Sequence, residues 1–354
     1  MILFVFLILI LCIAEQRPVT AGAGQFLPDY ISKENTAPVK GIFVMLIVVS
    51  HAFQHIEPDR TLDLLFQAFR SHLGQAVVAM FLFYSGFGIM ESIRKKGYDY
   101  IRSIPSRRFA NVFCRFCLIL FLYLILQYAF FRRSFPLKHI LLAFTGWTSL
   151  GNSNWYMFVI FLCYWLVFIS YLPMKRAGSR WIPAGTGILT VFSVVSVAAM
   201  IKAGAASWYY NTMILFAAGC WWSLLQERIK RLILHSDFTY CCTVTLTLCI
   251  YFLSYNRRGR GGIVVYSVWV LMFTALVLLF TMKVSIRSRL LTWFGDHVFE
   301  IYMLQRIPML VLEHYGAAAN HRYEFLIISF FSAVCLTYAF DWLVSRLKTL
   351  RKPV

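Results

Sequence analysis

Long blocks of apolar residues alternate with short charged segments along the whole chain. This pattern is typical of membrane-crossing segments, because a bilayer core needs about 20 mostly apolar residues of helix. Hydrocarbon offers no partner for backbone polar groups, so each block is expected to be helical. About ten spans are predicted on this basis. They are Lys40–Phe53, Gly74–Ile93, Phe109–Phe131, Trp155–Pro173, Trp181–Ile201, Tyr209–Leu225, Tyr240–Ser254, Gly262–Phe280, Val298–Leu312 and Tyr323–Val344.

Two other apolar blocks do not fit a simple span. His139–Leu150 is short and ends in the turn-like sequence Gly-Asn-Ser-Asn, so we interpret it as a partial or re-entrant segment. Ile2–Ala14 has the length of a signal-peptide core, and Ala21-Gly22-Ala23 would suit cleavage, but no Lys or Arg precedes the block. An uncleaved helix with its N-terminus outside the cell fits the loop charges better. Both interpretations remain open.

Composition supports the membrane assignment. Of the 354 residues, 60% are hydrophobic and only 14% are charged, whereas ordinary soluble domains carry about 25% charged residues. This is too little charge to cover a soluble body of this size. We therefore expect an all-α integral membrane protein, a bundle of about ten helices with an additional helix at the N-terminus. Residues 1–30 form an N-terminal hydrophobic segment and linker, and residues 31–354 form one membrane domain.

Loop charges predict the orientation of the chain. Lys and Arg gather in cytoplasmic loops, and alternate loops of this chain, including Arg94–Arg108, hold roughly twice as many as the opposite loops. Lys40 and the C-terminus are thereby placed in the cytoplasm, although the Arg257–Arg260 cluster runs against the bias. The net charge of +19 is interpreted as topology charge in contact with anionic lipid rather than as a nucleic-acid site. The expected location is the cell (inner) membrane.

His51 is the first candidate for chemistry. It follows Lys40 by eleven residues, about 16 Å along a helix, which is near the middle of a hydrocarbon core of about 30 Å. An ionisable group at that depth is a functional candidate. The alternative is a neutral histidine bonded to a neighbouring helix. His55 lies one turn further on, but a metal needs more ligands close by, so no metal site is expected.

Several segments, in order, resemble those of the acyltransferase family 3 membrane enzymes, over about Ile31 to Lys348. The segments are VKGIFVMLIVVSHAF with Lys40 and His51, FLFYSGFGIM with Ser85, SRRFANVF with Arg107 and Arg108, NSNWYM with Trp155 and Tyr156, and FGDHVFEIYMLQRIPM near the end. Members of this family O-acylate surface polysaccharides and other acceptors.

The resemblance implies an acyltransferase that uses acyl-CoA, with acetyl-CoA expected, as its donor substrate and holds no bound cofactor. His51 would act as general base or as transient acyl carrier. Lys40, Arg107 and Arg108 would bind the donor's phosphates, although each can equally be a topology charge. The acceptor is expected to be a glycan or lipid-linked glycan. Candidate acceptor-binding or supporting residues are Ser85, Trp155, Tyr156 and Glu300, for which helix packing or an interfacial aromatic belt is the alternative.

Three departures from the family pattern matter. Lys40 stands where members more often have Arg, and Lys lacks the planar bidentate fork. Val298 and Gln305 stand where the late pattern has Ser and His, so Gln305 receives no acid–base role.

The second function class that remains open is a transporter or flippase for a lipid-linked glycan. Transporters often contain matched halves with broken helices, and none are evident in this sequence.

Overall fold

A computed structural model describes residues 10, 19–22, 24–57 and 61–350, and these residues are almost entirely helical. The all-α prediction is confirmed. Most of the N-terminal block Ile2–Ala14 lies outside the described residues. The elements are β1 (Val19–Thr20), α2 (Lys33–Ala52), η1 (Phe53–His55), α3 (Thr61–Leu73), α4 (Ala76–Lys96), α5 (Tyr98–Ser103), η2 (Ile104–Ala110), α6 (Asn111–Ile125), η3 (Leu126–Phe130), α7 (Leu137–Phe144), α8 (Trp155–Tyr171), α9 (Met174–Ala177), η4 (Gly178–Trp181), α10 (Ile182–Lys202), η5 (Ser207–Tyr209), α11 (Ile214–Ile233), α12 (Asp237–Arg257), α13 (Gly262–Lys283), β2 (Val284–Ser285), α14 (Arg289–Asp296), α15 (Val298–Leu304), α16 (Arg306–His314), α17 (Ala317–Asn320) and α18 (Arg322–Leu350).

Within the described part of the chain, seven helical segments are long and apolar enough to cross a membrane. They are Lys33–His55, Asp63–Lys96, Tyr98–Phe130, Met174–Lys202, Asp237–Arg257, Gly262–Lys283 and Arg322–Leu347. The protein is therefore a multi-pass membrane protein. The remaining three predicted spans correspond to the shorter helix α8, to α11, and to the pair α15 and α16, which is interrupted at Gln305. The total of about ten stays a prediction.

The helix that carries His51 begins earlier than its apolar pattern predicts. α2 starts at Lys33, seven residues before the predicted start at Lys40. Its N-cap is Ser32, whose side chain accepts a hydrogen bond from the Asn35 backbone N–H at 3.3 Å. Such a cap satisfies an amide that otherwise has no partner. The first turns are polar, so the span prediction, which followed apolar residues only, missed them.

Two pairs of helices pack with their backbones in contact, and each contact depends on glycine. A Cβ at Gly41 of α2 would overlap the carbonyl oxygen of Leu291 in α14, and a Cβ at Gly295 of α14 would overlap that of Ala37 in α2. Small residues allow this close approach. Lipid tails are as apolar as the side chains, so helices in a bilayer associate through such van der Waals packing. α2 and α14 therefore hold each other at both sides of one crossing.

The second pair, α4 and α11, repeats this arrangement. A Cβ at Gly86 of α4 would overlap the carbonyl oxygen of Phe216 in α11, and a Cβ at Gly219 of α11 would overlap that of Phe83 in α4. Ser223 of α11 also donates a hydrogen bond to Glu91 of α4 at 2.6 Å. Gly86 belongs to the Ser-Gly-Phe sequence, so helix packing accounts for this glycine.

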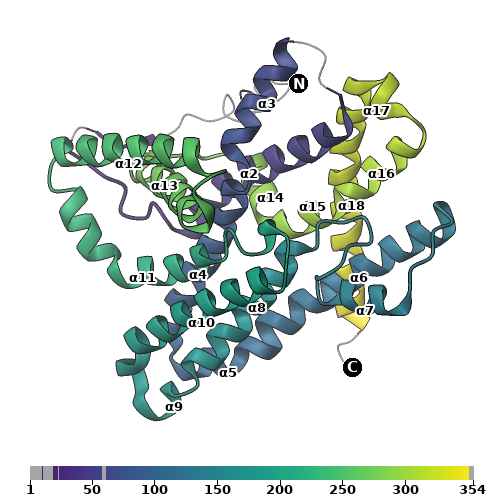
Figure 1. Ribbon diagram of the computed structural model, residues 1–354. Helices are drawn as coiled ribbons and strands as arrows, with labels where there is room; N and C mark the ends of the chain where they lie inside the picture. Colours follow the sequence, from purple (N-terminus) through teal and green to yellow (C-terminus); the bar gives the residue numbers. More distant parts are fainter. Residues whose placement is uncertain (1–9, 11–18, 23, 58–60, 351–354) are drawn as a thin grey trace.

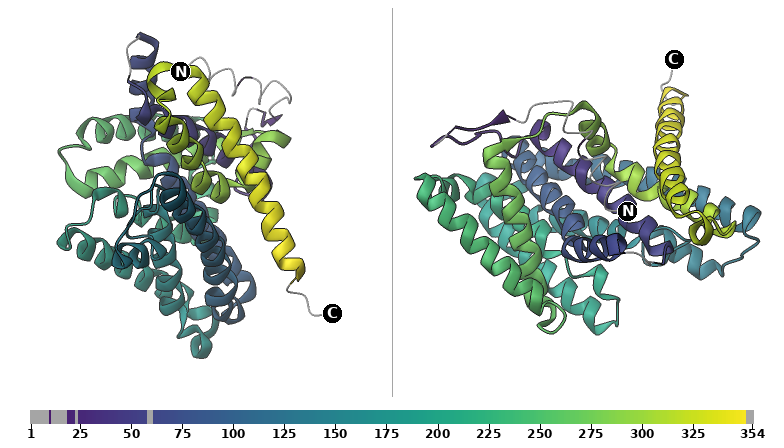
Figure 2. Two further views of the ribbon diagram at one scale, coloured as in Figure 1. Left: turned by 90° about the vertical axis from the view of Figure 1, so that its right-hand side faces the viewer. Right: turned by 90° about the horizontal axis from the view of Figure 1, so that it is seen from above.

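The other helices surround these two pairs. In Figure 1, α2, α14 and α15 lie in the middle, α12 and α13 lie to one side, and α6, α7 and α16 lie to the other. The long helix α18, drawn in yellow, runs along the edge of the molecule to the C-terminus (Figure 2). The segment predicted as re-entrant forms the eight-residue helix α7, followed by turns up to Asn154.

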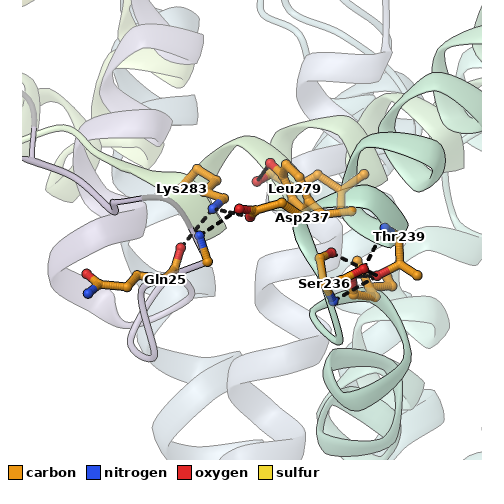
Figure 3. A network of polar contacts seen from close by, with 9 residues as sticks. Gln25, Ser236, Asp237, Thr239, Leu279 and Lys283 are labelled. Atoms are coloured by element: carbon orange, nitrogen blue, oxygen red, sulfur yellow. Dashed lines mark hydrogen bonds and ion pairs between the residues drawn. The ribbon is translucent and has the colours of Figure 1, made fainter.

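The described part of the N-terminal segment is tied to the ends of α12 and α13. Strand β1 pairs with β2 directly after α13. Lys283 donates hydrogen bonds to the Gln25 carbonyl at 2.9 Å and to Asp237 at 3.2 Å, and the Gly24 N–H donates to Asp237 at 2.7 Å (Figure 3). Residues 19–22 and 24–27 therefore lie beside the end of α13 and the start of α12.

The glycine contact between α4 and α11 can be tested with a pair of alanine substitutions. Gly86→Ala forces backbone to move and is expected to cost about 1–3 kcal/mol of stability. Gly88→Ala is the matched control, since a Cβ there meets no atom within 4 Å. The thermal unfolding midpoint in detergent should fall for Gly86→Ala only. Equal midpoints for both variants would contradict the packing described here.

Candidate functional site

A cavity of about 710 Å³ lies at the N-terminal end of α2. We call it the basic cavity, and its polar lining residues include Lys33, Lys40, Ser85, Arg108, Arg115 and Tyr156. Its size falls within the range of ordinary small-molecule sites. Four of the predicted site residues, on α2, α4, η2 and α8, are therefore brought together in one place.

The cations of the basic cavity are not equivalent. Lys33 forms an ion pair with Asp296 at 3.3 Å, and Arg115 is paired with carboxylates described below. Among the described residues, no carboxylate forms an ion pair with Lys40 or Arg108. Arg108 instead donates a hydrogen bond from Nε to the Tyr100 hydroxyl at 2.9 Å. Lys40 and Arg108 thus retain charge that an anionic ligand can neutralise.

Arg107 and Arg108 are separated by the structure although they are neighbours in sequence. Both side chains are exposed, but Arg108 lines the basic cavity and Arg107 does not. Successive residues of a helix point in different directions, and here, in the π-helix η2, only one of the two side chains lines the cavity. The prediction that treated both as equivalent donor-binding residues did not take this direction into account.

A second cavity, of about 860 Å³, lies at the C-terminal end of α2. We call it the histidine cavity. Its lining includes His51, Gln54, Arg70, Trp155, Tyr302 and Arg306, together with the polar loop before α8. In that loop Asn154 donates a hydrogen bond to the Thr148 carbonyl at 2.6 Å, and its side chain also bonds that of Asn152. The loop side of the cavity is therefore held by amide groups.

The imidazole of His51 has a free ring nitrogen. Its Nδ1 atom is buried and has no hydrogen-bond partner among the described residues. Arg306 and Arg70 are close enough to act on the ring electrostatically. Gln305, between α15 and α16, is close enough to hydrogen-bond the same ring, so the alternative of a histidine bonded to a neighbouring helix stays open. His55 is engaged elsewhere, in an ion pair with Glu313 at 3.0 Å.

Two tyrosines separate the cavities. Tyr156 lines the basic cavity and Tyr302 lines the histidine cavity. Their ring centroids are 5.8 Å apart in an edge-to-face arrangement, and the Tyr302 ring lies 6.1 Å from the His51 ring. Trp155 and Tyr156, adjacent in sequence, thus line different cavities. At this point the barrier between the cavities consists of side chains rather than backbone.

Glu300 belongs to a charge network that the sequence did not reveal. Its carboxylate pairs with Arg115, which also donates to Asp341 at 2.8 Å. Asp341 in turn contacts His297 Nε2 at 3.0 Å. Glu300 is therefore placed as a partner of Arg115 rather than of His51. The available signal was the presence of opposite charges, Arg115 and Asp341, inside two predicted spans.

Four residues of the histidine cavity had no assigned role in the sequence. Gln54 follows the end of one apolar block, Arg70 precedes the start of the next, and Asn152 lies in a turn-like loop, so each resembles an ordinary loop residue. Arg306 stood out only as a charge near Glu300. Their convergence depends on long-range contacts between α2, α3, α8 and α16, for which the local pattern carries no signal.

A family model described as an acyltransferase domain matches residues 39–346. The match covers most of the chain and includes Lys40, His51 and Arg108. No curated protein and no solved structure is significantly similar to the chain.

Removal of Glu300 tests the charge network. Glu300 is 2% exposed, and Glu300→Ala takes one of two carboxylates from Arg115. Removal of one partner from a buried ion pair is expected to cost about 3–5 kcal/mol. Glu324→Ala is the control, because that carboxylate is largely exposed and such surface changes stay within about 0.5 kcal/mol. Thermal unfolding in detergent compares the two, and an unchanged midpoint for Glu300→Ala would argue against the network.

Proposed function

Because the chain belongs to the acyltransferase family 3, we propose that this membrane acyltransferase moves an acyl group, acetyl in the first instance, from cytoplasmic acyl-CoA to a hydroxyl of an extracytoplasmic or lipid-linked glycan at the cell (inner) membrane. Family membership favours this function over a transporter or flippase. The observation that carries the proposal is the pair of cavities at opposite ends of α2, one with unpaired cations and one with His51.

The basic cavity is the proposed donor site. Acyl-CoA carries several phosphate charges, and Lys40 and Arg108 have charge available for them. Arg suits a phosphate through paired N–H donors, whereas Lys contributes a point charge. The loop charges support a cytoplasmic opening for this cavity, which is the side on which acyl-CoA is made. Arg107 is then a topology charge.

The histidine cavity is the proposed acceptor site. About 16 Å of helix separates Lys40 from His51, a distance that the extended thiol arm of CoA has to cover. In this proposal the arm passes the contact between Tyr156 and Tyr302 and presents the thioester to His51. Those two side chains also keep water away from the thioester until an acceptor is bound.

The proposed chemistry is general-base catalysis. A sugar hydroxyl is a poor nucleophile at neutral pH, and the His51 imidazole takes its proton as the oxygen attacks the thioester carbonyl. Collapse of the tetrahedral intermediate breaks the C–S bond, and the proton passes from the imidazolium to the thiolate. The products are the ester and free CoA. In the carrier route the acyl group rests on His51 first, and a labelled acyl group retained without acceptor would identify it.

Donor binding is tested with the two adjacent arginines. Arg108→Ala should raise the apparent KM for acetyl-CoA by about tenfold, the loss expected for a charge-assisted hydrogen bond. Arg107→Ala serves as the matched control and should change that KM less than about twofold. Steady-state CoA release by purified protein measures both. Equal effects of the two substitutions would argue against the donor site.

The role of His51 is tested with the two histidines of one helix end. His51→Ala should lower kcat at least about 100-fold while the protein inserts at parental levels, because the general base is lost. His55→Ala removes only an ion pair outside the cavity and should keep most of the activity. Transfer of labelled acetyl to glycan is the measurement. Near-normal transfer by His51→Ala would refute the proposed mechanism.

A further inference from the structure

The histidine cavity has positive charge without a matching negative charge. Arg70 and Arg306 both line it, and its lining includes no aspartate or glutamate within the described ranges. Glu313, an acidic side chain near this end of α2, is engaged with His55. The basic cavity differs, because its lining contains Asp296 beside Lys33.

Both guanidinium groups keep most of their donors unused by the protein. An arginine has five N–H donors. Arg70 donates from Nη1 to the Ser50 carbonyl at 3.2 Å, and Arg306 donates from Nη2 to Gln54 at 3.0 Å. The Nε atom of Arg306 is buried and lacks a partner in the described part of the chain. A buried donor of this kind is costly unless a ligand completes its hydrogen bonding.

A purely structural role accounts for part of this arrangement. The side chain of Arg70, from α3, reaches the C-terminal end of α2. A cation is favourable there beside unpaired carbonyls, and the hydrogen bond to the Ser50 carbonyl fits that role. The same account does not apply to Arg306, which comes from α16 and leaves Nε unpaired. Both arginines also act electrostatically on the His51 ring. Their convergence on one histidine points to a ligand beside it.

The remaining lining suits a carbohydrate. Aromatic rings are contributed by Trp155, Trp208 and Tyr209, and amide groups by Asn152 and Asn211. Aromatic rings pack against the apolar face of a sugar ring, and side-chain amides both donate to and accept from its hydroxyls.

We propose that the acceptor glycan is acidic, and that Arg70 and Arg306 bind its carboxylate or phosphate while a nearby hydroxyl faces His51. This inference rests on the proposed function, because it concerns the acceptor of that reaction. Oxyanions match the arginine fork in geometry and charge. A neutral glycan would leave both cations without a partner, so the cavity selects against it.

The test is binding of defined probes to the purified full-length protein in detergent. One probe is a tetrasaccharide of glucuronic acid, the second is its carboxyl-reduced neutral counterpart, and the third is that neutral tetrasaccharide with a 1-phosphate. At least one charged probe should bind about tenfold or more tightly than the neutral one. Arg70→Gln and Arg306→Gln should each remove about tenfold of that preference. The first and third probes distinguish a carboxylate from a phosphate.

Matched variants keep this test decisive. Arg133→Gln removes an exposed arginine outside the cavity lining and should preserve the preference. Arg70→Lys and Arg306→Lys retain the charge and should recover part of it, and unfolding midpoints confirm that each variant is folded. Equal binding of charged and neutral probes, or an equal loss with Arg133→Gln, would overturn the inference.

Failure of this inference is distinguishable from failure of the proposed function. Transfer of acetyl to the neutral tetrasaccharide, dependent on His51 and indifferent to charge, would leave the acyltransferase intact and refute the acidic acceptor. Arginine-dependent binding of a charged probe without any His51-dependent use of acetyl-CoA would support an acidic ligand in this cavity and refute the acyltransferase.

Discussion

Direct contact between helix backbones is the constraint on which the rest of the structure depends. Gly41 and Gly295 bring α2 against α14, and Gly86 and Gly219 bring α4 against α11. An apolar side chain gains little free energy when it moves from lipid to a helix interface, so helix association relies on this close van der Waals contact. Three of these four glycines also adjoin a polar residue of the basic cavity: Lys40 precedes Gly41, Ser85 precedes Gly86, and Asp296 follows Gly295. The contacts that assemble the bundle therefore also fix the position of the site.

Charges within the bundle divide into two groups by how they are neutralised. Arg115 is held by Glu300 and Asp341, and this pairing makes its burial tolerable. Lys40, Arg108, Arg70 and Arg306 have no ion-pair partner within the described chain. Such cations destabilise a membrane protein, and an anionic ligand that neutralises their charge offsets this destabilisation. This distinction, rather than the number of basic residues, separates structural charges from binding charges.

The sequence carried information about depth and helicity but not about side-chain direction. Helix rise alone predicts that His51 lies near mid-membrane. In the structure His51 lies one residue before the end of α2, and its depth stays a prediction. The difference between Arg107 and Arg108 could not be predicted, because both share the same local pattern. The charge network around Glu300 has no local signal either: Arg115 and Asp341, which pair within it, are 226 residues apart. Helix starts were missed where polar caps, as at Ser32, lie outside the apolar block.

The pairing of α2 with α14 has a consequence for biosynthesis. The helix that carries Lys40 and His51 leaves the ribosome long before its backbone partner α14, because eleven of the α-helices lie between them in the sequence. Lys283 reaches back over 258 residues to Gln25 in the same way. The early helix must therefore remain in the bilayer with its glycine face uncovered while most of the protein is still being made. Both cavities are completed only after α14 to α16 have been made, so a chain terminated before these helices inserts its earlier helices but assembles no site.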